Sequence, residues 1–200
     1  VRALGVKDAL LGNLGMFPIA RELGFTLRGD FGLEIYNAQA LKEYKRLGLQ
    51  SATLSFELKL AQIRDLSKCL DTELITYGRL PLMITENCLV QNETGCRLDR
   101  QGPCVPEDGP CRCGQPNVLV DRTGAAFPLL PAYGHRTEIQ NSKPLYLADR
   151  PEHRRLGLAY ARLRFTTETA EECVSVVQNY LDAAPAAGDF TRGLYERGVE

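Results

Sequence analysis

The sequence predicts an α/β fold that corresponds to the C-terminal half of a TIM-like (β/α)8 barrel with a loop-rich, cysteine-bearing insertion. Over residues 1–87, short apolar runs alternate with amphipathic runs at a spacing of about twenty residues. Short strands that alternate with helices of about ten to twelve residues are typical of βαβ units around a parallel sheet. We count four such strands, whereas a closed barrel has eight. We therefore expect half a barrel, the first half lying elsewhere in a longer protein; the alternative is an open, doubly wound sheet.

The first two βα units are predicted from their apolar runs and from the glycine and asparagine residues that mark the ends of the expected helices. A strand is expected over Ala9–Leu11, and apolar residues at helical spacing then continue to Gly24, which suits a helix C-terminus. A second strand is expected over Phe25–Leu27. The helix after it is expected to begin beyond Asn37, a favourable N-cap, and to end at Gly48.

Two further units complete this series. The third strand is expected over Ala52–Phe56, followed by a helix that carries Leu60, Ile63 and Leu66 on its apolar side. The fourth strand is expected over Glu73–Tyr77. No G-x-G-x-x-G and no G-x-x-x-x-G-K-[ST] motif follows any of these strands, so the sequence excludes phosphate-binding loops of those two types.

The composition changes near residue 83. We expect three parts: half-barrel βα units over 1–82, a cysteine-rich insertion over 83–143, and a closing α/β segment over 144–200. The insertion is rich in Pro, Gly, Asn and Asp, and its expected regular structure is one hairpin formed by Val118–Val120 and Ala126–Leu130. The closing segment is expected to contain strands over Leu145–Leu147 and Leu158–Phe165 and a helix over Ala170–Leu181.

The charge of the chain is nearly balanced, with 24 basic and 25 acidic side chains and a net charge of −1. This balance excludes a broadly basic nucleic-acid coat and an acidic disordered tail. No apolar run reaches the roughly eighteen residues that a membrane span needs, so we expect no membrane association. Since no secretion signal is visible, we expect a cytoplasmic, reducing environment.

The cysteines are clustered. Five of the seven lie within 26 residues, in the pattern C-x7-C-x7-C-x6-C-x-C from Cys88 to Cys113. In a reducing compartment such a cluster favours metal binding over disulfides, and thiolates bind both Zn²⁺ and iron–sulfur clusters. The long spacings lack the C-x2-C pairs of a zinc ribbon, so we favour an iron–sulfur cluster, with zinc or spare thiols as alternatives. His135 is a candidate further ligand or a hydrogen-bonded loop histidine, while Cys69 and Cys173 are expected in the core.

Polar side chains follow the expected strands at the points where these end. Asn13, Asp30, Glu57 and Arg79 each come directly after an apolar run. Ligands of parallel α/β folds bind at the carboxyl edge of the sheet, so these four residues are candidate catalytic residues. Arg79 offers a fork for a carboxylate, and Glu57 could act as a general base. The alternative is that Asn13 and Asp30 form turns and that Glu57 is a carboxylate in the first turn of a helix.

An arginine-rich stretch lies near the expected last strand; its members are Arg150, Arg154, Arg155, Arg162 and Arg164. Such charges could contact the phosphates of RNA. Because Asp149 and Glu152 lie among them, the alternative interpretation is a solvated face.

The segment Glu73–Cys88 resembles the signature of peptidase family U32, the collagenase-like peptidases. Six further fragments extend this resemblance over most of the chain; they span residues 12–15, 29–37, 54–58, 119–129, 141–145 and 190–198. The resemblance implies a TIM-barrel-like catalytic domain. Pro81 and Tyr146 stand where relatives usually carry cluster cysteines. The resemblance therefore implies a ligand set drawn from Cys88, Cys96, Cys111, Cys113 and His135.

The resemblance leaves three functions open. Well understood relatives are iron–sulfur proteins, with 4Fe–4S clusters expected here, that assist hydroxylation of RNA bases or ubiquinone precursors. Some of them use prephenate as the hydroxyl source. On this hypothesis the partners are tRNA or rRNA and a small carboxylate co-substrate. The second hypothesis is a collagenase-like peptidase, although the chain has no H-E-x-x-H, no G-x-S-x-G and only two histidines. The third is a non-catalytic module stabilised by zinc.

Overall fold

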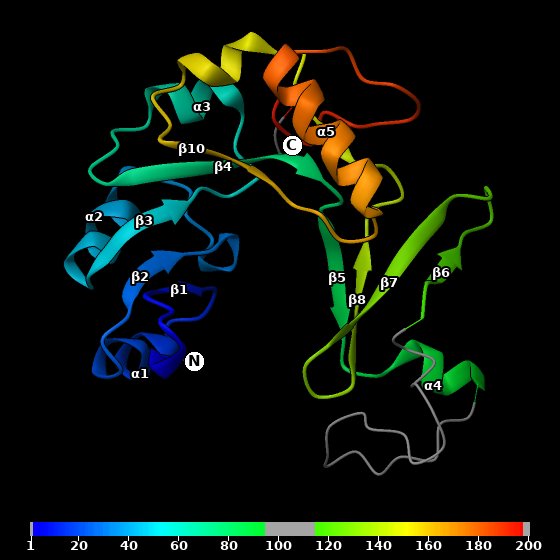
Figure 1. The fold of residues 1–200 in the computed structure, drawn as a ribbon, viewed down its shortest axis with the longest axis horizontal. Helices are drawn as coiled ribbons and strands as arrows, with labels where there is room; N and C mark the ends of the chain where they lie inside the picture. The colour runs from blue at the N-terminus through cyan, green and yellow to red at the C-terminus, as the bar shows by residue number, and fades with distance from the viewer. Residues whose placement is uncertain (1, 95–114, 198–200) are drawn as a thin grey trace.

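A computed structural model of the chain describes residues 2–94 and 115–197 and contains two β-sheets (Figure 1). The larger sheet has five parallel strands, in the order β1 (Asp8–Leu11), β2 (Thr26–Gly29), β3 (Leu49–Thr53), β4 (Asp71–Gly78) and β10 (Tyr160–Leu163). A short strand, β9 (Leu145–Tyr146), pairs antiparallel with the end of β4. The molecule is therefore a mixed α/β protein whose larger sheet is mainly parallel, as the strand and helix pattern predicts.

Helices connect β1 to β2, β2 to β3 and β3 to β4, and they bury their apolar sides against one face of the sheet. These helices are α1 (Met16–Glu22), α2 (Ala38–Arg46) and α3 (Leu60–Asp65). Leu41 of α2 and Ile63 of α3 are fully buried in one core cluster with strand residues such as Leu74. Asn37 caps α2 by accepting a hydrogen bond from the backbone amide of Ala40 at 2.9 Å, so the expected N-cap is confirmed. Short 3-10 turns cover Arg2–Leu4 (η1) and Phe31–Leu33 (η2).

The strand order runs through the chain without a reversal. A doubly wound sheet reverses its order at a switch point, whereas the wall of a βα barrel keeps sequential order. Within the described residues the larger sheet does not close into a barrel, and its two edges are β1 and β10. The sequential order agrees with the wall of a barrel, and half a barrel stays a prediction.

The second sheet is antiparallel and lies within the segment expected to be rich in loops. Its order is β5 (Pro81–Thr85), β8 (Arg136–Gln140), β7 (Ala126–Ala132) and β6 (Asn117–Val120). The expected hairpin is confirmed as β6 and β7, but β5 and β8 are additional strands. These two strands pair with each other across more than fifty intervening residues, so local turn signals in the sequence cannot reveal β5. Strand β8 also forms a hairpin with β7 across a turn of three residues. The six-residue helix α4 (Leu89–Thr94) follows β5.

The closing segment contains η4 (Pro151–Arg155), β10 and α5 (Ala170–Asp182). Helix α5 begins with a capping box between Thr169 and Glu172, in agreement with the expected helix. The expected third strand is displaced, because β3 pairs with β2 and β4 over Leu49–Thr53 and the chain leaves the sheet before Phe56. Over the residues that the structure describes, no helix is both long and apolar enough to span a bilayer.

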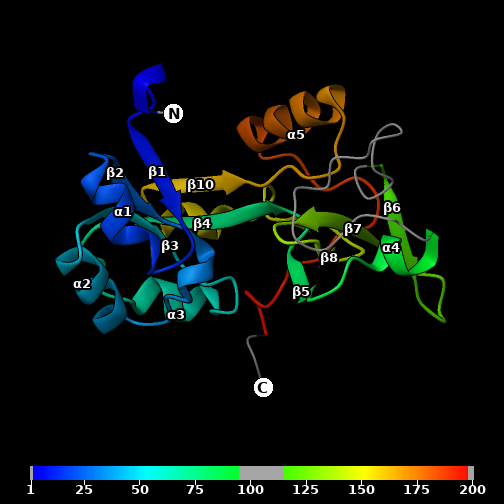
Figure 2. The same cartoon turned by 90° about the horizontal axis from the view of Figure 1, so that it is seen from below.

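The two sheets meet at the carboxyl end of β4. The chain passes from β4 into β5 through Arg79 and Leu80, and it returns from β8 to β9 through residues 141–144. Figures 1 and 2 both show the antiparallel sheet beyond the ends toward which the parallel strands point. The second sheet is thus placed next to the edge at which parallel α/β folds bind their ligands.

Candidate functional site

Successive residues of a strand face opposite sides of its sheet. In the larger sheet, Leu27, Ala52 and Leu74 pack with the helices, so the polar residues between them face the other side. Arg28 and Glu73 belong to this second face. Parallel sheets normally bury both faces under apolar residues, so a charged face is a feature that requires a function or a polar partner.

Arg162 of β10 is the centre of a polar network on this face. Its Nη1 lies 2.6 Å from Asp30 Oδ1, and its Nη2 lies 2.5 Å from Glu73 Oε1. Nη2 also donates to Thr53 Oγ1 at 3.0 Å. Because all three charged side chains are less than a quarter exposed, these ion pairs are stronger than pairs in open solvent. The network holds β2, β3, β4 and β10 together on one side of the sheet.

A cavity of about 260 Å³ adjoins this network. Its polar lining consists of Arg28, Ser51, Thr53, Glu73, Tyr160 and Arg162. Arg28 donates to Asp8 Oδ1 at 2.8 Å and to Ser51 Oγ at 3.1 Å, and the hydrogen bond to Asp8 raises the pKa of Arg28. The cavity thus offers two guanidinium groups, hydroxyl groups and one carboxylate to a small polar molecule.

Glu57, a candidate general base, lies in a second polar group formed by the segments that follow β2 and β3. The Tyr36 hydroxyl donates to Glu57 Oε2 at 2.5 Å and lies 3.0 Å from Glu34 Oε2. Burial and the hydrogen bond to Glu57 raise the pKa of Tyr36 to about 12, so the phenol stays protonated at neutral pH. Glu34 has a left-handed backbone conformation with φ 50°, which is uncommon for a residue other than glycine.

The other residues expected at the sheet edge have structural contacts. Asn13 accepts a hydrogen bond from the Gly15 amide at 2.7 Å and shapes the turn before α1. Asp30 caps η2 through the Phe31 amide at 2.8 Å, in addition to its ion pair with Arg162. Arg79 donates to the carbonyl oxygens of two residues, Asn141 and Ser142, which connect β8 to β9. The structure thus brings Asp30 to the cavity network, Glu57 to Tyr36, and Arg79 to the junction of the sheets.

Cys88 and His135 lie at the same end of the antiparallel sheet. The segment after β5 is joined to the start of β8 by an ion pair of 3.0 Å between Glu86 and Arg136, and by a hydrogen bond of 3.1 Å from the Leu89 amide to Thr137 Oγ1. His135 directly precedes β8. Cys88 is half-buried with a free thiol, and its Sγ accepts from the Gln91 amide at 3.4 Å.

The remaining cysteines of the predicted cluster cannot be placed. Cys96, Cys104, Cys111 and Cys113 lie outside the described residues. Among the residues that are described, no group of three or more His, Cys, Asp or Glu side chains is suited to hold a metal ion. Cys69 is half-buried and packs against the main core, as expected, whereas Cys173 is half-buried on α5 and belongs to neither core cluster. Cys88 is thus the one predicted thiol ligand whose surroundings are known.

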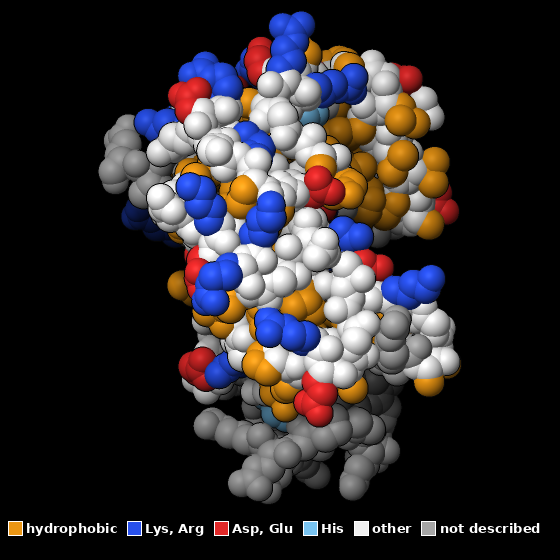
Figure 3. All heavy atoms as spheres, turned by 90° about the vertical axis from the view of Figure 1, so that its left-hand side faces the viewer, with side chains coloured by type: hydrophobic (Ala, Val, Ile, Leu, Met, Phe, Trp, Pro, Cys, Tyr) orange, Lys and Arg blue, Asp and Glu red, His pale blue; other side chains and the backbone are white. Residues whose placement is uncertain are grey.

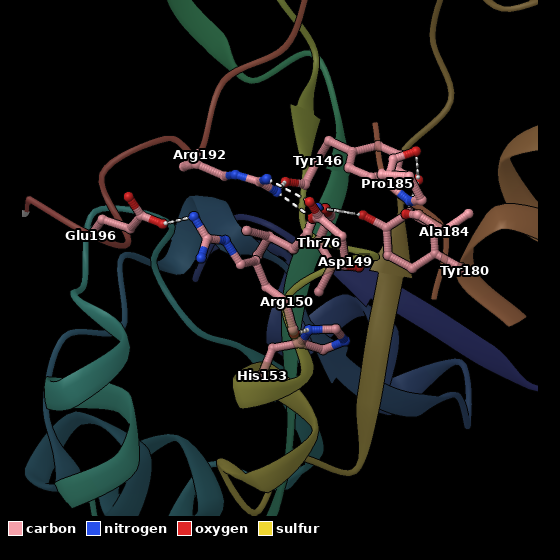
Figure 4. Close-up of polar contacts among 11 residues, drawn as sticks. Thr76, Tyr146, Asp149, Arg150, His153, Tyr180, Ala184, Pro185, Arg192 and Glu196 are labelled. Carbon is pink, nitrogen blue, oxygen red and sulfur yellow. Dashed lines mark hydrogen bonds and ion pairs between the residues drawn. The ribbon is translucent and has the colours of Figure 1, made fainter. Parts of the chain in front are cut away.

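A further polar group holds the C-terminal segment against β4 and β9 (Figure 4). Asp149 and Arg192 form a two-point ion pair with distances of 2.6 and 2.7 Å, and Arg192 lowers the pKa of Asp149. The Tyr180 hydroxyl donates to the Thr76 carbonyl oxygen and accepts from the Leu147 amide. These side chains satisfy one another and backbone groups, so we interpret the group as structural.

The sequence analysis did not select Arg162, Glu73 or Tyr36 as candidate site residues. For Arg162 and its neighbour Arg164, the sequence does contain a usable pattern. Arg162 belongs to the arginine-rich stretch, but the sequence does not distinguish it from solvated neighbours. Alternation within β10 could have separated Arg162 and Arg164 from exposed arginines such as Arg155. Glu73 stands within an expected strand, and Tyr36 carries no separate signal.

The surface gives no sign of a basic patch on the face drawn in Figure 3. Lysine and arginine side chains are scattered over that face with acidic side chains among them. The scattered arrangement agrees with the balanced composition, since a nucleic-acid footprint is normally a contiguous basic area.

Comparison with known proteins gives one family match. The family model described as peptidase family U32 matches residues 1–120, which is more than half of the chain and includes β1 to β5 and Cys88. No curated protein and no solved structure matches the chain.

Proposed function

The chain belongs to peptidase family U32, and on this basis we propose that it is part of an iron–sulfur-dependent enzyme that assists hydroxylation of RNA bases or a related small substrate. The observation that carries the proposal is the position of the antiparallel sheet. This sheet starts at the carboxyl edge of the parallel sheet and holds Cys88 and His135 at its other end. The two connected sheets thereby carry the polar cavity on the parallel sheet and Cys88 at the far end of the antiparallel sheet.

The proposed architecture is half of a (β/α)8 barrel. Its support is the sequential parallel order and the two sheet edges, β1 and β10, that lack a further strand within the described residues. Apolar side chains lie exposed beside both edges; they include Leu14, Ile19 and Leu23 near β1 and Val174 and Leu181 on α5. In a closed barrel such side chains would pack against the neighbouring βα units.

The cofactor proposal is a 4Fe–4S cluster, with zinc as the alternative. The residues that would hold it are Cys88, Cys96, Cys111 and Cys113, with His135 as a further candidate. Cys88 fits this role in part, because its thiol is free and half-buried directly before α4, which leads into the cysteine segment. A bound cluster would supply one-electron chemistry. The described residues alone do not complete such a site.

The roles proposed for the other residues are binding and proton transfer. Arg28 would bind the carboxylate of a small co-substrate such as prephenate, because guanidinium groups recognise carboxylates with two hydrogen bonds. Arg162, Asp30 and Glu73 would hold the cavity wall. Glu57 would act as a general base, and Tyr36 would set its orientation through the 2.5 Å hydrogen bond.

A peptidase is the second candidate, as the family name states. The observation in its favour is that Cys88 and His135 share one end of a sheet, since a thiol and an imidazole can form a nucleophile and base. His153, the other histidine, is buried, and its Nδ1 contacts the Arg150 carbonyl oxygen. His153 is therefore a poor candidate for catalysis.

The deciding experiment is anaerobic purification followed by assays of iron, acid-labile sulfide and zinc. We expect iron and sulfide in equal, stoichiometric amounts, and their loss in Cys88→Ser. Cys173→Ser is the matched control, because Cys173 is a half-buried thiol on α5, outside the antiparallel sheet. Stoichiometric zinc without sulfide would overturn the iron–sulfur proposal in favour of a zinc-stabilised module.

Two activity assays separate the enzyme hypotheses. Deletion of the gene should remove a hydroxylated nucleoside from tRNA or rRNA, as measured by mass spectrometry. Cleavage of collagen or casein by the anaerobically purified protein, abolished by Cys88→Ser, would instead support the peptidase.

A further inference from the structure

We propose that Arg164 is a positioning residue that fixes the orientation of the antiparallel sheet relative to the cavity-bearing parallel sheet. Arg164 directly follows β10, and its backbone amide donates to the Tyr77 carbonyl oxygen at 2.9 Å. Its backbone is thus anchored to the end of β4. Only the expected effect of Arg164 on the reaction rate rests on the proposed function. The geometry of the junction is independent of any reaction.

The guanidinium group of Arg164 contacts the second sheet at its base. Nη1 donates to Gln140 Oε1 at 2.7 Å and to the Arg79 carbonyl oxygen at 2.5 Å. Nη2 lies 2.8 Å from Glu138 Oε1. Glu138 and Gln140 belong to β8, and Arg79 lies between β4 and β5, so one side chain contacts both β8 and the link that leads from the parallel sheet into the antiparallel one.

The same guanidinium group also contacts the edge of the parallel sheet. Its central carbon lies 5.8 Å from the centre of the Phe31 ring, which is within the range of a cation–π interaction. Phe31 is adjacent to Asp30 of the cavity network, and its ring packs 5.6 Å from that of Phe56, the neighbour of Glu57. Arg164 therefore links β8 with the two loops that carry the candidate site residues.

Burial and shape make this contact specific to arginine. The side chains of Arg164 and Glu138 are 18% and 21% exposed, so the ion pair is shielded from most of the solvent. A lysine has one point charge and cannot donate in three fixed directions while stacking on a ring. At the same place, a Cβ on Gly78 would lie 2.0 Å from the Arg164 carbonyl oxygen, so the backbones are in close contact.

The test measures the distance between one label on each sheet region, without any assay of activity or metal. Spin labels are attached to noncanonical residues at Gln39 on α2 and at Tyr133 after β7, because the native cysteines exclude thiol labelling; Tyr133 is 96% exposed. Pulsed electron resonance then gives the distance distribution. We expect a narrow distribution in the parent protein and a broadened, shifted one in Arg164→Gln, with Arg164→Lys between the two.

Arg136→Gln is the matched control, because it removes an exposed arginine that forms an ion pair with Glu86 in the same sheet. Its distribution should equal that of the parent. If Arg164→Gln does not fold, as judged by circular dichroism, Glu138→Gln removes the same ion pair and should broaden the distribution less strongly. A folded Arg164→Gln or Glu138→Gln protein with the parent distribution would overturn the proposal.

A second readout concerns the proposed reaction. If the proposed function holds, Arg164→Lys should lower kcat while KM for the small co-substrate stays unchanged, because the cavity itself is intact. Broadening of the distances in a protein without hydroxylation activity would uphold the positioning role and reject the proposed function. Unchanged distances in an Arg164 variant of an enzyme with hydroxylation activity would reject the positioning role and uphold the proposed function.

Discussion

Arg28 and Arg162 line the same cavity, yet the two guanidinium groups differ in how firmly they are held. The side chain of Arg162 is 18% exposed and forms ion pairs with two carboxylates, whereas that of Arg28 is 39% exposed and forms one ion pair, with the exposed Asp8, beside its hydrogen bond to Ser51. Exposed ion pairs contribute about 0–1 kcal/mol, so a ligand can replace Asp8 at little cost. Arg28 is therefore the residue that can bind a ligand, and Arg162 is the residue that shapes the wall.

This difference predicts the effect of Arg28→Gln on binding. On the proposed function, we expect Arg28→Gln to raise the Kd for prephenate, measured by isothermal titration calorimetry, about tenfold, which corresponds to about 1.4 kcal/mol. Arg46→Gln is the control, because Arg46 pairs with Glu43 on the surface of α2. Equal affinity of Arg28→Gln and the parent protein for prephenate would show that Arg28 does not bind this ligand.

His153 predicts a dependence of stability on pH. The residue is 5% exposed, and burial lowers its pKa below the ordinary value of 6.5. Below pH 6.5 the unfolded chain therefore binds a proton that the folded chain does not. The contribution of His153 to stability is complete above pH 6.5 and decreases as the pH falls toward the lowered pKa.

Urea unfolding between pH 7.5 and pH 5 measures this effect. We expect His153→Gln to remove a decrease of at most about 1.4 kcal/mol per pH unit below pH 6.5. His135→Gln, which also removes one imidazole, should retain the decrease. An unchanged pH dependence in His153→Gln would show that other groups cause it.

At the scale of the elements, Gly78 at the end of β4 determines how closely β10 approaches. Its φ of 118° favours glycine, and a Cβ there would meet the Arg164 carbonyl oxygen at 2.0 Å. We expect Gly78→Ala to lower the free energy of unfolding by about 3 kcal/mol, because a backbone atom must move. In the control Gly134→Ala, φ is 74° but no atom lies within 4 Å, so the loss should be about 1 kcal/mol. Equal losses in urea unfolding would contradict the close approach.

The elements also show how far the sequence alone predicts the structure. Helix α2 and its cap at Asn37 could be predicted because spacing and capping are local properties. Strand β5 could not, since its partner β8 lies across a long segment and β5 has no strong local pattern. Strand β8 follows β7 after a turn of three residues, which the sequence analysis did not interpret as a hairpin. The ion pair of Asp30 with Arg162 joins residues 132 positions apart, so its existence depends on the strand order. For this reason Asp30 could be chosen as a site residue while its partner was missed.

At the scale of the whole molecule, apolar side chains are exposed to solvent beside both edge strands of the larger sheet. Beside β10, a groove of about 300 Å³ runs between this strand and α5, and Val174 and Leu181 of α5 are 70% and 71% exposed. Beside β1, Ile19 and Leu23 are about half exposed. Sequential order could be anticipated from the repeat of strand and helix. What covers these two edges could not, because within the described residues no further strand pairs with β1 or β10.

The exposed side of α5 predicts that the chain by itself associates through this surface. Burial of one valine side chain contributes about 1.5 kcal/mol, so Val174→Lys should weaken self-association about tenfold or more in sedimentation velocity experiments. Ser175→Lys is the matched control, because it adds the same charge to the neighbouring exposed position without removing apolar area. Since Val174 contributes little to the core, neither substitution should change the melting temperature appreciably. Equal weakening by both substitutions would assign the effect to charge and not to the apolar side of α5.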